Sequence, residues 1–254
     1  MESKKEYHIA LSLSDGARYV IITGDPGRAE HIARMTEAPN HIAFNREFNT
    51  WSGIIEGERV LITSTGIGGP SAAIAVEELA HIGADTVIRV GTCGGMNKSV
   101  APGELVIAQA AIRQEGTGNE YLPLEFPAVA DFGVTAALSS AAEKLGFPAH
   151  IGVVQSKDSF YGQHSPESMP IAGILQDKWN AWLAAGCLAS EMECAALFLL
   201  GAVRNLRTGA VLHCVWNQET GSGVGGERRN LDTDNAAKAA IEAMRSIIVS
   251  DKEI

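Results

Sequence analysis

The sequence predicts an α/β fold, a single-domain α/β/α sandwich with a central mixed β-sheet. Apolar runs rich in β-branched residues alternate with segments whose apolar residues recur at helical spacing. The chain has 254 residues, enough to bury one sizeable core, and contains no low-complexity tract or composition break that would mark a linker. We therefore predict one domain over residues 1–254.

Buried strands are predicted where a short β-branched run lies between turn-forming residues. These runs are Tyr19–Thr23, Val60–Thr63, Thr86–Val90, Leu105–Ala110, Ile151–Gln155 and Ala210–Trp216. Because helical segments separate several of them, a mixed or largely parallel sheet is favoured.

Two helices have clear apolar faces. Pro70 suits a first helical turn, and Ala75, Leu79 and Ile82 follow it at helical spacing. The apolar stripe of the C-terminal helix consists of Ala237, Ile241, Met244 and Ile248.

Glycine and proline predict two long loops, Gln114–Pro127 and Asn217–Asn230. The second loop directly follows a predicted core strand. We therefore expect it to form a flap over a pocket at the carboxyl end of that strand.

Composition argues against several classes of partner. The formal net charge is −10 and no block of lysine and arginine is present, so a nucleic-acid partner is not expected. No apolar run approaches the roughly 18 residues of a membrane span, and no signal-like stretch follows the first residues. The four cysteines lack CxxC spacing, which is typical of reduced thiols in a cytoplasmic protein.

Three glycine-bearing segments place an arginine or a hydroxyl group beside a predicted strand end. They are GDPGR at Gly24–Arg28, STGIGGPS at Ser64–Ser71 and RVGTCGG at Arg89–Gly95. Arg46, in the run FNREF, supplies a further guanidinium. An acidic protein gains little from cations at strand ends unless an anion lies among them, so these segments predict an oxyanion pocket.

The surroundings of Arg89 strengthen this prediction. The residue lies inside the apolar run VIRV, where an unpaired guanidinium would be costly, and Thr92 follows it in a glycine-flanked turn. The segment STGIGGPS lacks the third glycine of a dinucleotide motif, and the chain has no nucleoside-triphosphate loop motif. A small anion is therefore expected.

The run SEME has a structural interpretation. Ser190, followed three residues later by Glu193, predicts a capping box at the start of a helix. Glu191 and Glu193 would then share a pocket only if the backbone there is extended or just entering the helix.

The motifs GDPGR, FNREFNTW, STGIGGPS, RVGTCGG, PLEFPAVADF, DSFYGQ and SEMECAA occur in this order across most of the chain. In this respect the sequence resembles the uridine phosphorylase branch of the hexameric nucleoside phosphorylase family. The resemblance implies a pentosyltransferase that performs reversible phosphorolysis of uridine to uracil and ribose 1-phosphate. It also implies a homo-oligomer, a hexamer built from dimers, with phosphate as co-substrate and no organic cofactor.

The resemblance further implies a role for each residue that matches a family motif. Phosphate would be bound by Gly24, Arg28, Arg89 and Thr92 of one subunit and by Arg46 of its neighbour. Ribose would be bound by Met192, Glu193 and the neighbour's His8, so that Arg89, Thr92 and Glu193 are the catalytic residues. Phe160 would pack on the nucleoside and Gln163 would read the uracil edge. A potassium ion between paired subunits would be held at Glu47, Ile67 and Ser71.

The base pocket departs from the family pattern. Many members have an arginine two residues after the uracil-reading glutamine, whereas His164 and Ser165 follow Gln163 here. The leaving base carries negative charge, so another donor is required. Lys157 and His164 are the candidates, and Lys157 is favoured because its charge persists at neutral pH. Gln218 also stands where relatives often carry an arginine.

Two alternative functions remain open. A purine nucleoside phosphorylase would have the same fold, but such relatives place an aspartate after the strand that ends here in VWNQ. A non-catalytic nucleoside-binding module could use the same pocket. A nucleosidase that uses water would not require Arg28, Arg46 and Arg89 together.

Overall fold

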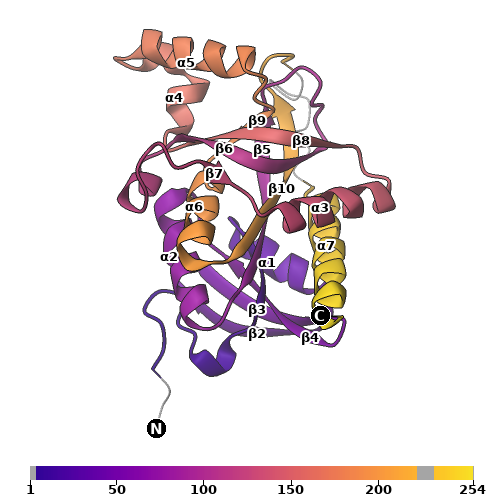
Figure 1. Cartoon of the computed structure of the whole chain (residues 1–254). Coiled ribbons are helices and arrows are strands. Elements are labelled where there is room, and N and C mark those ends of the chain that lie inside the picture. Colours follow the sequence, from indigo (N-terminus) through magenta and orange to yellow (C-terminus); the bar gives the residue numbers. More distant parts are fainter. Residues whose placement is uncertain (1–3, 222–231, 254) are drawn as a thin grey trace.

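In the computed structural model, which describes residues 4–221 and 232–253, ten strands form one mixed sheet (Figure 1). The strands are β1 (Tyr19–Thr23), β2 (Glu37–Asn45), β3 (Phe48–Ile55), β4 (Glu58–Ser64), β5 (Thr86–Gly95), β6 (Leu105–Gln114), β7 (Ala128–Val129), β8 (Ala149–Lys157), β9 (Ala189–Glu191) and β10 (Arg207–Asn217).

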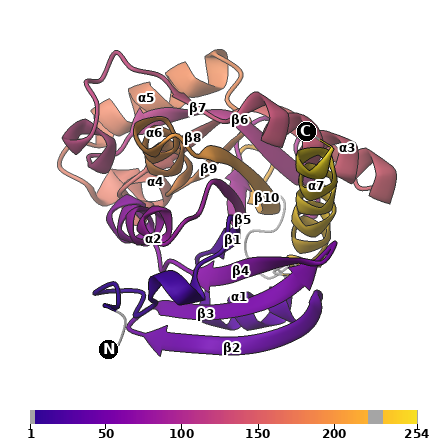
Figure 2. The ribbon, with the colours of Figure 1, turned by 60° about the horizontal axis from the view of Figure 1, so that its bottom comes forward.

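Five of these strands close into a ring. The order along the sheet is β10-β6-β8-β9-β5-β1-β4-β3-β2, and β10 also pairs with β5. Strand β10 is parallel to β5 and antiparallel to β6, so it joins the two ends of the run β6-β8-β9-β5. The remaining strands β1, β4, β3 and β2 extend from β5 as an open sheet, with β2 at its edge (Figure 2).

Helices cover both faces of the sheet. The described helices are α1 (Pro26–Ala33), α2 (Gly69–His81), α3 (Phe132–Leu145), α4 (Phe160–His164), α5 (Ala172–Ala184), α6 (Cys194–Arg204) and α7 (Asp234–Lys252). Side chains alternate between the faces of a strand, so in β1 Val20 and Ile22 pack with α2 and α6, whereas Tyr19 and Ile21 pack with α1, α3 and α7. These two cores confirm the predicted α/β/α arrangement.

The predicted elements are found, with some additions. All six predicted strands are present, and both predicted helices form. Strands β2, β3, β7 and β9 were not predicted. The loop Gln114–Pro127 contains one short 3-10 turn, Thr117–Glu120.

The topology brings several strand ends together. Strands β1, β4, β5 and β10 run parallel, so their carboxyl ends lie at one edge. The segments after β1 and β4 carry the first two glycine motifs, and β5 itself carries the third. The short strand β9 pairs antiparallel with the end of β5, which brings Ser190 opposite Gly94.

No helix among residues 4–221 and 232–253 is both long and apolar enough to cross a membrane.

Candidate functional site

A cavity of about 880 Å³ opens at the carboxyl ends of the parallel strands. Its walls come from the three glycine motifs, the ends of β8 and β9, and helix α4. Among its lining residues are twelve of the predicted site residues: Gly24, Arg28, Glu47, Ile67, Ser71, Arg89, Thr92, Lys157, Phe160, His164, Met192 and Glu193. Residues far apart in the sequence thus line one cavity.

The amino-terminal end of α1 contributes Arg28. Asp25 caps this helix by accepting a hydrogen bond from the Arg28 backbone N–H at 2.8 Å, and Pro26 occupies the first turn. The Arg28 guanidinium donates to Thr23 Oγ1 at 3.1 Å. Burial and the nearby charge of Arg89 lower the pKa of Arg28. Among the described residues it forms no ion pair, so its charge is available to an anion in the cavity.

Arg89 lies at the centre of a buried charge cluster. It is 4% exposed, donates a hydrogen bond to Glu193 and lies 3.5 Å from Glu191. Burial disfavours its charged form, but the carboxylates of Glu193 and Glu191 outweigh that effect and raise the pKa of Arg89. Within the described part of the chain its Nε–H has no hydrogen-bond partner. This buried donor could be satisfied by an oxyanion.

Gly91 makes room for this arginine. A Cβ atom at that position would lie 2.8 Å from Arg89 Nη2. The glycine in RVGTCGG therefore lets the guanidinium fold back along β5 toward the carboxylates.

Glu193 is held at the amino-terminal end of α6. Its Oε1 accepts a hydrogen bond from the Gly68 backbone N–H at 2.6 Å, and its other oxygen accepts from Arg89. Burial raises the pKa of Glu193, while the Arg89 charge opposes that shift. The carboxylate is thus fixed in position between the second and third glycine motifs.

The predicted capping box at Ser190 is wrong. Ser190 lies in the extended strand β9, and the helix begins only at Cys194. Glu191 performs the capping, because its carboxylate accepts hydrogen bonds from the backbone N–H groups of Glu193 at 2.8 Å and Cys194 at 2.9 Å. The extended backbone explains how Glu191 and Glu193 both reach Arg89.

Lys157 enters the cavity from the end of β8. It is 5% exposed, and its Nζ donates to Ser190 Oγ at 2.5 Å and lies 6.0 Å from the Phe160 ring centre. Burial lowers the pKa of Lys157 to about 8, although Glu191 and Glu193 favour its charge. The side chain is therefore still mainly an ammonium at neutral pH.

Three rings form one wall of the cavity. The His164 ring lies 4.2 Å from that of Phe160 and 4.8 Å from that of Trp216, between ring centres. These side chains come from α4 and β10, and their planes are tilted by 54° between Phe160 and His164 and by 46° between His164 and Trp216. The wall therefore offers individual ring faces and edges against which a planar ligand can pack.

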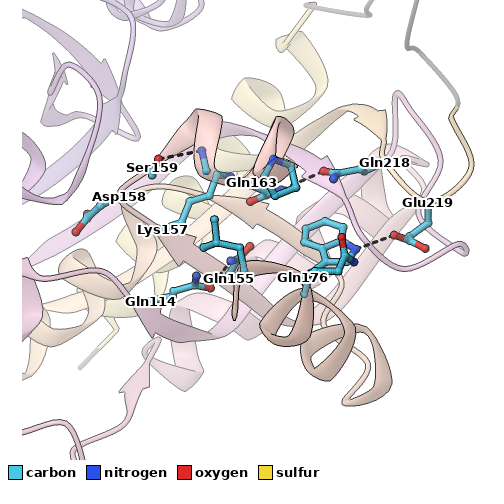
Figure 3. A pocket seen from close by; sticks show the side chains of 13 residues that line it. Gln114, Gln155, Lys157, Asp158, Ser159, Gln163, Gln176, Gln218 and Glu219 are labelled. Atoms are coloured by element: carbon cyan, nitrogen blue, oxygen red, sulfur yellow. Dashed lines mark hydrogen bonds between the residues drawn. The ribbon is translucent and has the colours of Figure 1, made fainter. Parts of the chain in front are cut away.

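Gln163 lines a second, smaller cavity of about 370 Å³ (Figure 3). Lys157 lines both cavities and so marks their junction. Gln163 Nε2 donates to Gln218 Oε1 at 3.2 Å, and Gln163 Oε1 accepts from Ser190 Oγ at 2.6 Å. Gln163, the residue predicted to read the base, therefore does not line the larger cavity with the aromatic wall but the smaller one, which shares Lys157 with it.

Two predicted residues do not reach the cavity of their own chain. The His8 ring bonds Glu78 Oε1 at 2.7 Å, and Arg46 lies on the turn between β2 and β3 with its guanidinium 5.9 Å from the Tyr7 ring centre. Asn45 Nδ2 donates to the His8 carbonyl at 2.7 Å and ties these two segments together. The oxyanion pocket of one chain thus contains Arg28 and Arg89 but not Arg46.

The three residues predicted to hold a potassium ion, Glu47, Ile67 and Ser71, all line the larger cavity. Ser71 Oγ donates to Glu47 Oε1 at 2.7 Å, and Ile67 is exposed. Carboxylate and hydroxyl oxygens are ligands that hard cations accept. In residues 4–221 and 232–253 no group of three or more His, Cys, Asp or Glu side chains could hold a metal ion.

Of the predicted flap Asn217–Asn230, residues 222–230 lie outside the described residues. Asn217 itself is buried and donates to the backbone carbonyls of Asn97 and Val100, each at 2.8 Å.

Sequence reasoning missed three contributors to this site. Glu191 was considered only as a neighbour of Glu193, Ser190 was interpreted as a helix cap, and Trp216 was expected only as the end of a strand. Only Trp216 had a signal in the sequence, as an aromatic residue at the end of a predicted strand; Ser190 and Glu191 lie in β9, which no local pattern predicts.

Comparison with known proteins gives a consistent set of relatives. The sequence profile described as "Phosphorylase superfamily" matches residues 18–250. The chain is 53% identical over 246 residues to a uridine phosphorylase of Treponema pallidum, covering 97% of this chain and 95% of the relative. It is 43% identical over 255 residues to a uridine phosphorylase of Thermococcus kodakarensis, covering 99% and 90%. It is also 38% identical over 231 residues to a guanosine phosphorylase of Halorubrum lacusprofundi, covering 91% and 89%.

Proposed function

The chain belongs to the phosphorylase superfamily, and we propose that it catalyses the reversible phosphorolysis of uridine to uracil and ribose 1-phosphate. It would thus be a nucleoside phosphorylase, a pentosyltransferase that uses phosphate as co-substrate without an organic cofactor. The relatives named uridine phosphorylase at 53% and 43% identity support this assignment. The observation that carries it is the joint placement of Arg28, Arg89 and Glu193 beside an aromatic wall in one cavity.

The reaction requires no protein nucleophile. A phosphate oxygen attacks C1′ of the ribose, the bond from C1′ to N1 of the base breaks, and its electron pair leaves with uracil. Arg28, Arg89 and Thr92 would position the phosphate, with the backbone near Gly24 allowing its close approach. The Nε–H of Arg89, which finds no hydrogen-bond partner in residues 4–221 and 232–253, supports this role.

The sugar would lie over Glu193 and Met192. In the transition state the ribose becomes cationic, and the negative charge of Glu193 favours that state while its oxygens orient the hydroxyl groups. Since Gly68 and Arg89 already hold the carboxylate, little reorganisation would be needed during the reaction.

The departing base gathers negative charge. Phe160 would pack against it, Gln163 would read its edge, and Lys157 would donate to it, with His164 supporting the aromatic wall. Lys157 is better placed than His164 to stabilise this charge because it is cationic at neutral pH and lines both cavities.

A direct assay tests the proposal. Purified protein is incubated with uridine, with and without inorganic phosphate, and free uracil and ribose 1-phosphate are measured. We expect uracil release only with phosphate. Release without phosphate would indicate a nucleosidase, and cleavage of guanosine in preference to uridine would support the purine alternative that the Halorubrum relative exemplifies.

His8 and Arg46 support an oligomer. We infer that both serve the cavity of a neighbouring subunit, in a hexamer built from dimers, because both lie outside their own cavity and are tied together on the surface through Asn45. The same pairing would place Glu47, Ile67 and Ser71 close to a subunit boundary, where a potassium ion would bind.

Mixed oligomers provide the test. We expect Arg28→Ala and Arg46→Ala each to raise the KM for phosphate strongly when present alone, because each removes a cation from every site. The two variants are then unfolded and reassembled together. In a hybrid pair, the site of the Arg46→Ala subunit has its own Arg28 and receives Arg46 from the Arg28→Ala subunit, so that one site contains both arginines. Phosphorolysis at low phosphate should therefore recover in the mixture, and a mixture no more active than its components would contradict shared sites.

A further inference from the structure

A chain of three consecutive hydrogen bonds, one buried and two partly buried, links the two cavities. Lys157 Nζ donates to Ser190 Oγ at 2.5 Å, Ser190 Oγ donates to Gln163 Oε1 at 2.6 Å, and Gln163 Nε2 donates to Gln218 Oε1 at 3.2 Å. Ser190 is 2% exposed, and Figure 3 shows the ends of Gln163 and Gln218 joined by a dashed line that marks their hydrogen bond. These hydrogen bonds thus join four residues: Lys157 of β8, Ser190 of β9, Gln163 of α4 and Gln218 in the turn after β10.

The direction of this chain follows from the chemistry of its first member. An ammonium group has three N–H donors and no acceptor, so Ser190 Oγ has to accept the hydrogen bond from Lys157. The single hydroxyl hydrogen of Ser190 then points to Gln163 and requires an acceptor there. Only the carbonyl oxygen of the Gln163 amide can meet that requirement, so its NH₂ group turns toward Gln218.

Reversal of the Gln163 amide would be costly. It would place an NH₂ group where the buried hydroxyl of Ser190 needs an acceptor, and it would set the two glutamine carbonyl oxygens against each other. A buried donor without an acceptor costs more than an ordinary hydrogen bond contributes.

A fixed amide discriminates between pyrimidines. Gln163 retains one lone pair on Oε1 and one hydrogen on Nε2 for a ligand, which suits an edge with an N–H group beside a carbonyl. Uracil has this edge at N3 and its adjacent carbonyl group. Cytosine has an unprotonated N3 beside an amino group, which requires the reversed amide.

We propose that Ser190 is a positioning residue that, with Lys157, locks the Gln163 amide in the orientation that accepts uracil and rejects cytosine. This inference rests on the proposed function, because it assigns Gln163 to the base of the substrate. It goes further because it names the cause of the base specificity. That cause is the donor-to-acceptor direction of the hydrogen bonds from Lys157 through Ser190 to Gln163, in addition to the shape of the cavity.

The test compares Ser190→Ala with the wild type. The substitution removes the hydroxyl that orients Gln163, so we expect the ratio of kcat/KM for uridine to kcat/KM for cytidine to fall at least about tenfold, as for the loss of one orienting hydrogen bond. The KM for uridine should rise while the KM for phosphate stays unchanged. Ser190→Thr retains a hydroxyl and should restore most of the ratio.

Control measurements separate orientation from general damage. Ser168→Ala removes a hydroxyl that bonds the Ser165 carbonyl at 2.7 Å on an exposed turn, and it should leave the ratio as in the wild type. Thermal unfolding of each variant checks its fold. An unchanged uridine-to-cytidine ratio in Ser190→Ala, or a threonine variant as unselective as the alanine variant, would overturn the proposal.

Binding of the free bases distinguishes failure of this inference from failure of the proposed function. Calorimetric titration with uracil and with cytosine measures the preference without turnover. If the wild type cleaves no uridine, the proposed function fails, yet a uracil preference that Ser190→Ala removes would still support the locked amide. Equal affinity of the wild type for both bases would overturn it.

Discussion

Replacing Arg89 by alanine is expected to lower kcat for uridine phosphorolysis by roughly 10²–10³-fold, the effect of losing one preorganised donor to the reacting group. The substitution removes the charge that we propose binds phosphate, and it also removes the partner of Glu193 and Glu191. Two carboxylates would then remain buried without their cation, which typically costs about 3–5 kcal/mol of stability. Steady-state kinetics and thermal unfolding measure the two effects separately.

Arg89→Lys separates catalysis from folding. Lysine keeps a positive charge between the carboxylates, so the unfolding temperature should stay closer to that of the wild type. It lacks the planar guanidinium with its parallel N–H donors, so kcat should remain strongly reduced. Arg204→Ala is the matched control, because Arg204 pairs with Glu77 on the surface. Substantial residual phosphorolysis in Arg89→Ala would count against its role.

Lys157→Met is expected to lower kcat by roughly 10²-fold, because it removes the cationic donor available to the departing base while keeping an unbranched side chain of similar length. The KM for phosphate should change little. The pH profile gives an independent measure. The ammonium is present below its pKa of about 8 and is lost above it, so wild-type kcat should fall as the pH rises through about 8.

This alkaline limb should be absent from Lys157→Met, whose residual rate would be flat over the same range. Lys178→Met, on the exposed face of α5, is the matched control and should behave like the wild type. Full uridine turnover by Lys157→Met would rule out the assigned role and leave His164 as the remaining candidate.

The sequence predicted the buried strands well. The run Tyr19–Thr23 coincides with β1, since all five of its side chains are buried and its pattern is local. Strand β2 was missed because it lies at the sheet edge, is mostly exposed and contains Pro39, so neither burial nor propensity reveals it. Strand β9 has three residues and forms only because β8 and β5 lie on either side of it.

The site was predicted in part. The buried position of Arg89 in VIRV required an anionic partner, and the structure supplies two carboxylates for it. The identity of these carboxylates depends on whether the run SEME is helical or extended. The predicted helix cap at Ser190 is wrong because this segment pairs with β5 and β8, and the local sequence does not reveal such long-range pairing. The hydrogen bond from Lys157 to Ser190 likewise joins two strand ends that share no local pattern.

Closure of β10 onto both β5 and β6 also sets how different parts of the molecule exchange amide hydrogens with solvent. Residues 86–90 of β5 and residues 210–213 of β10 have a neighbouring strand on each side, so their backbone N–H groups should exchange only when the sheet opens, whereas those of the edge strand β2 can exchange through local fraying. Arg89 lies in the segment expected to exchange slowly, and Arg46 adjoins the one expected to exchange fast. If phosphate binds both arginines as proposed, it should slow deuterium uptake chiefly around residues 45–48, where most local motion remains to be suppressed.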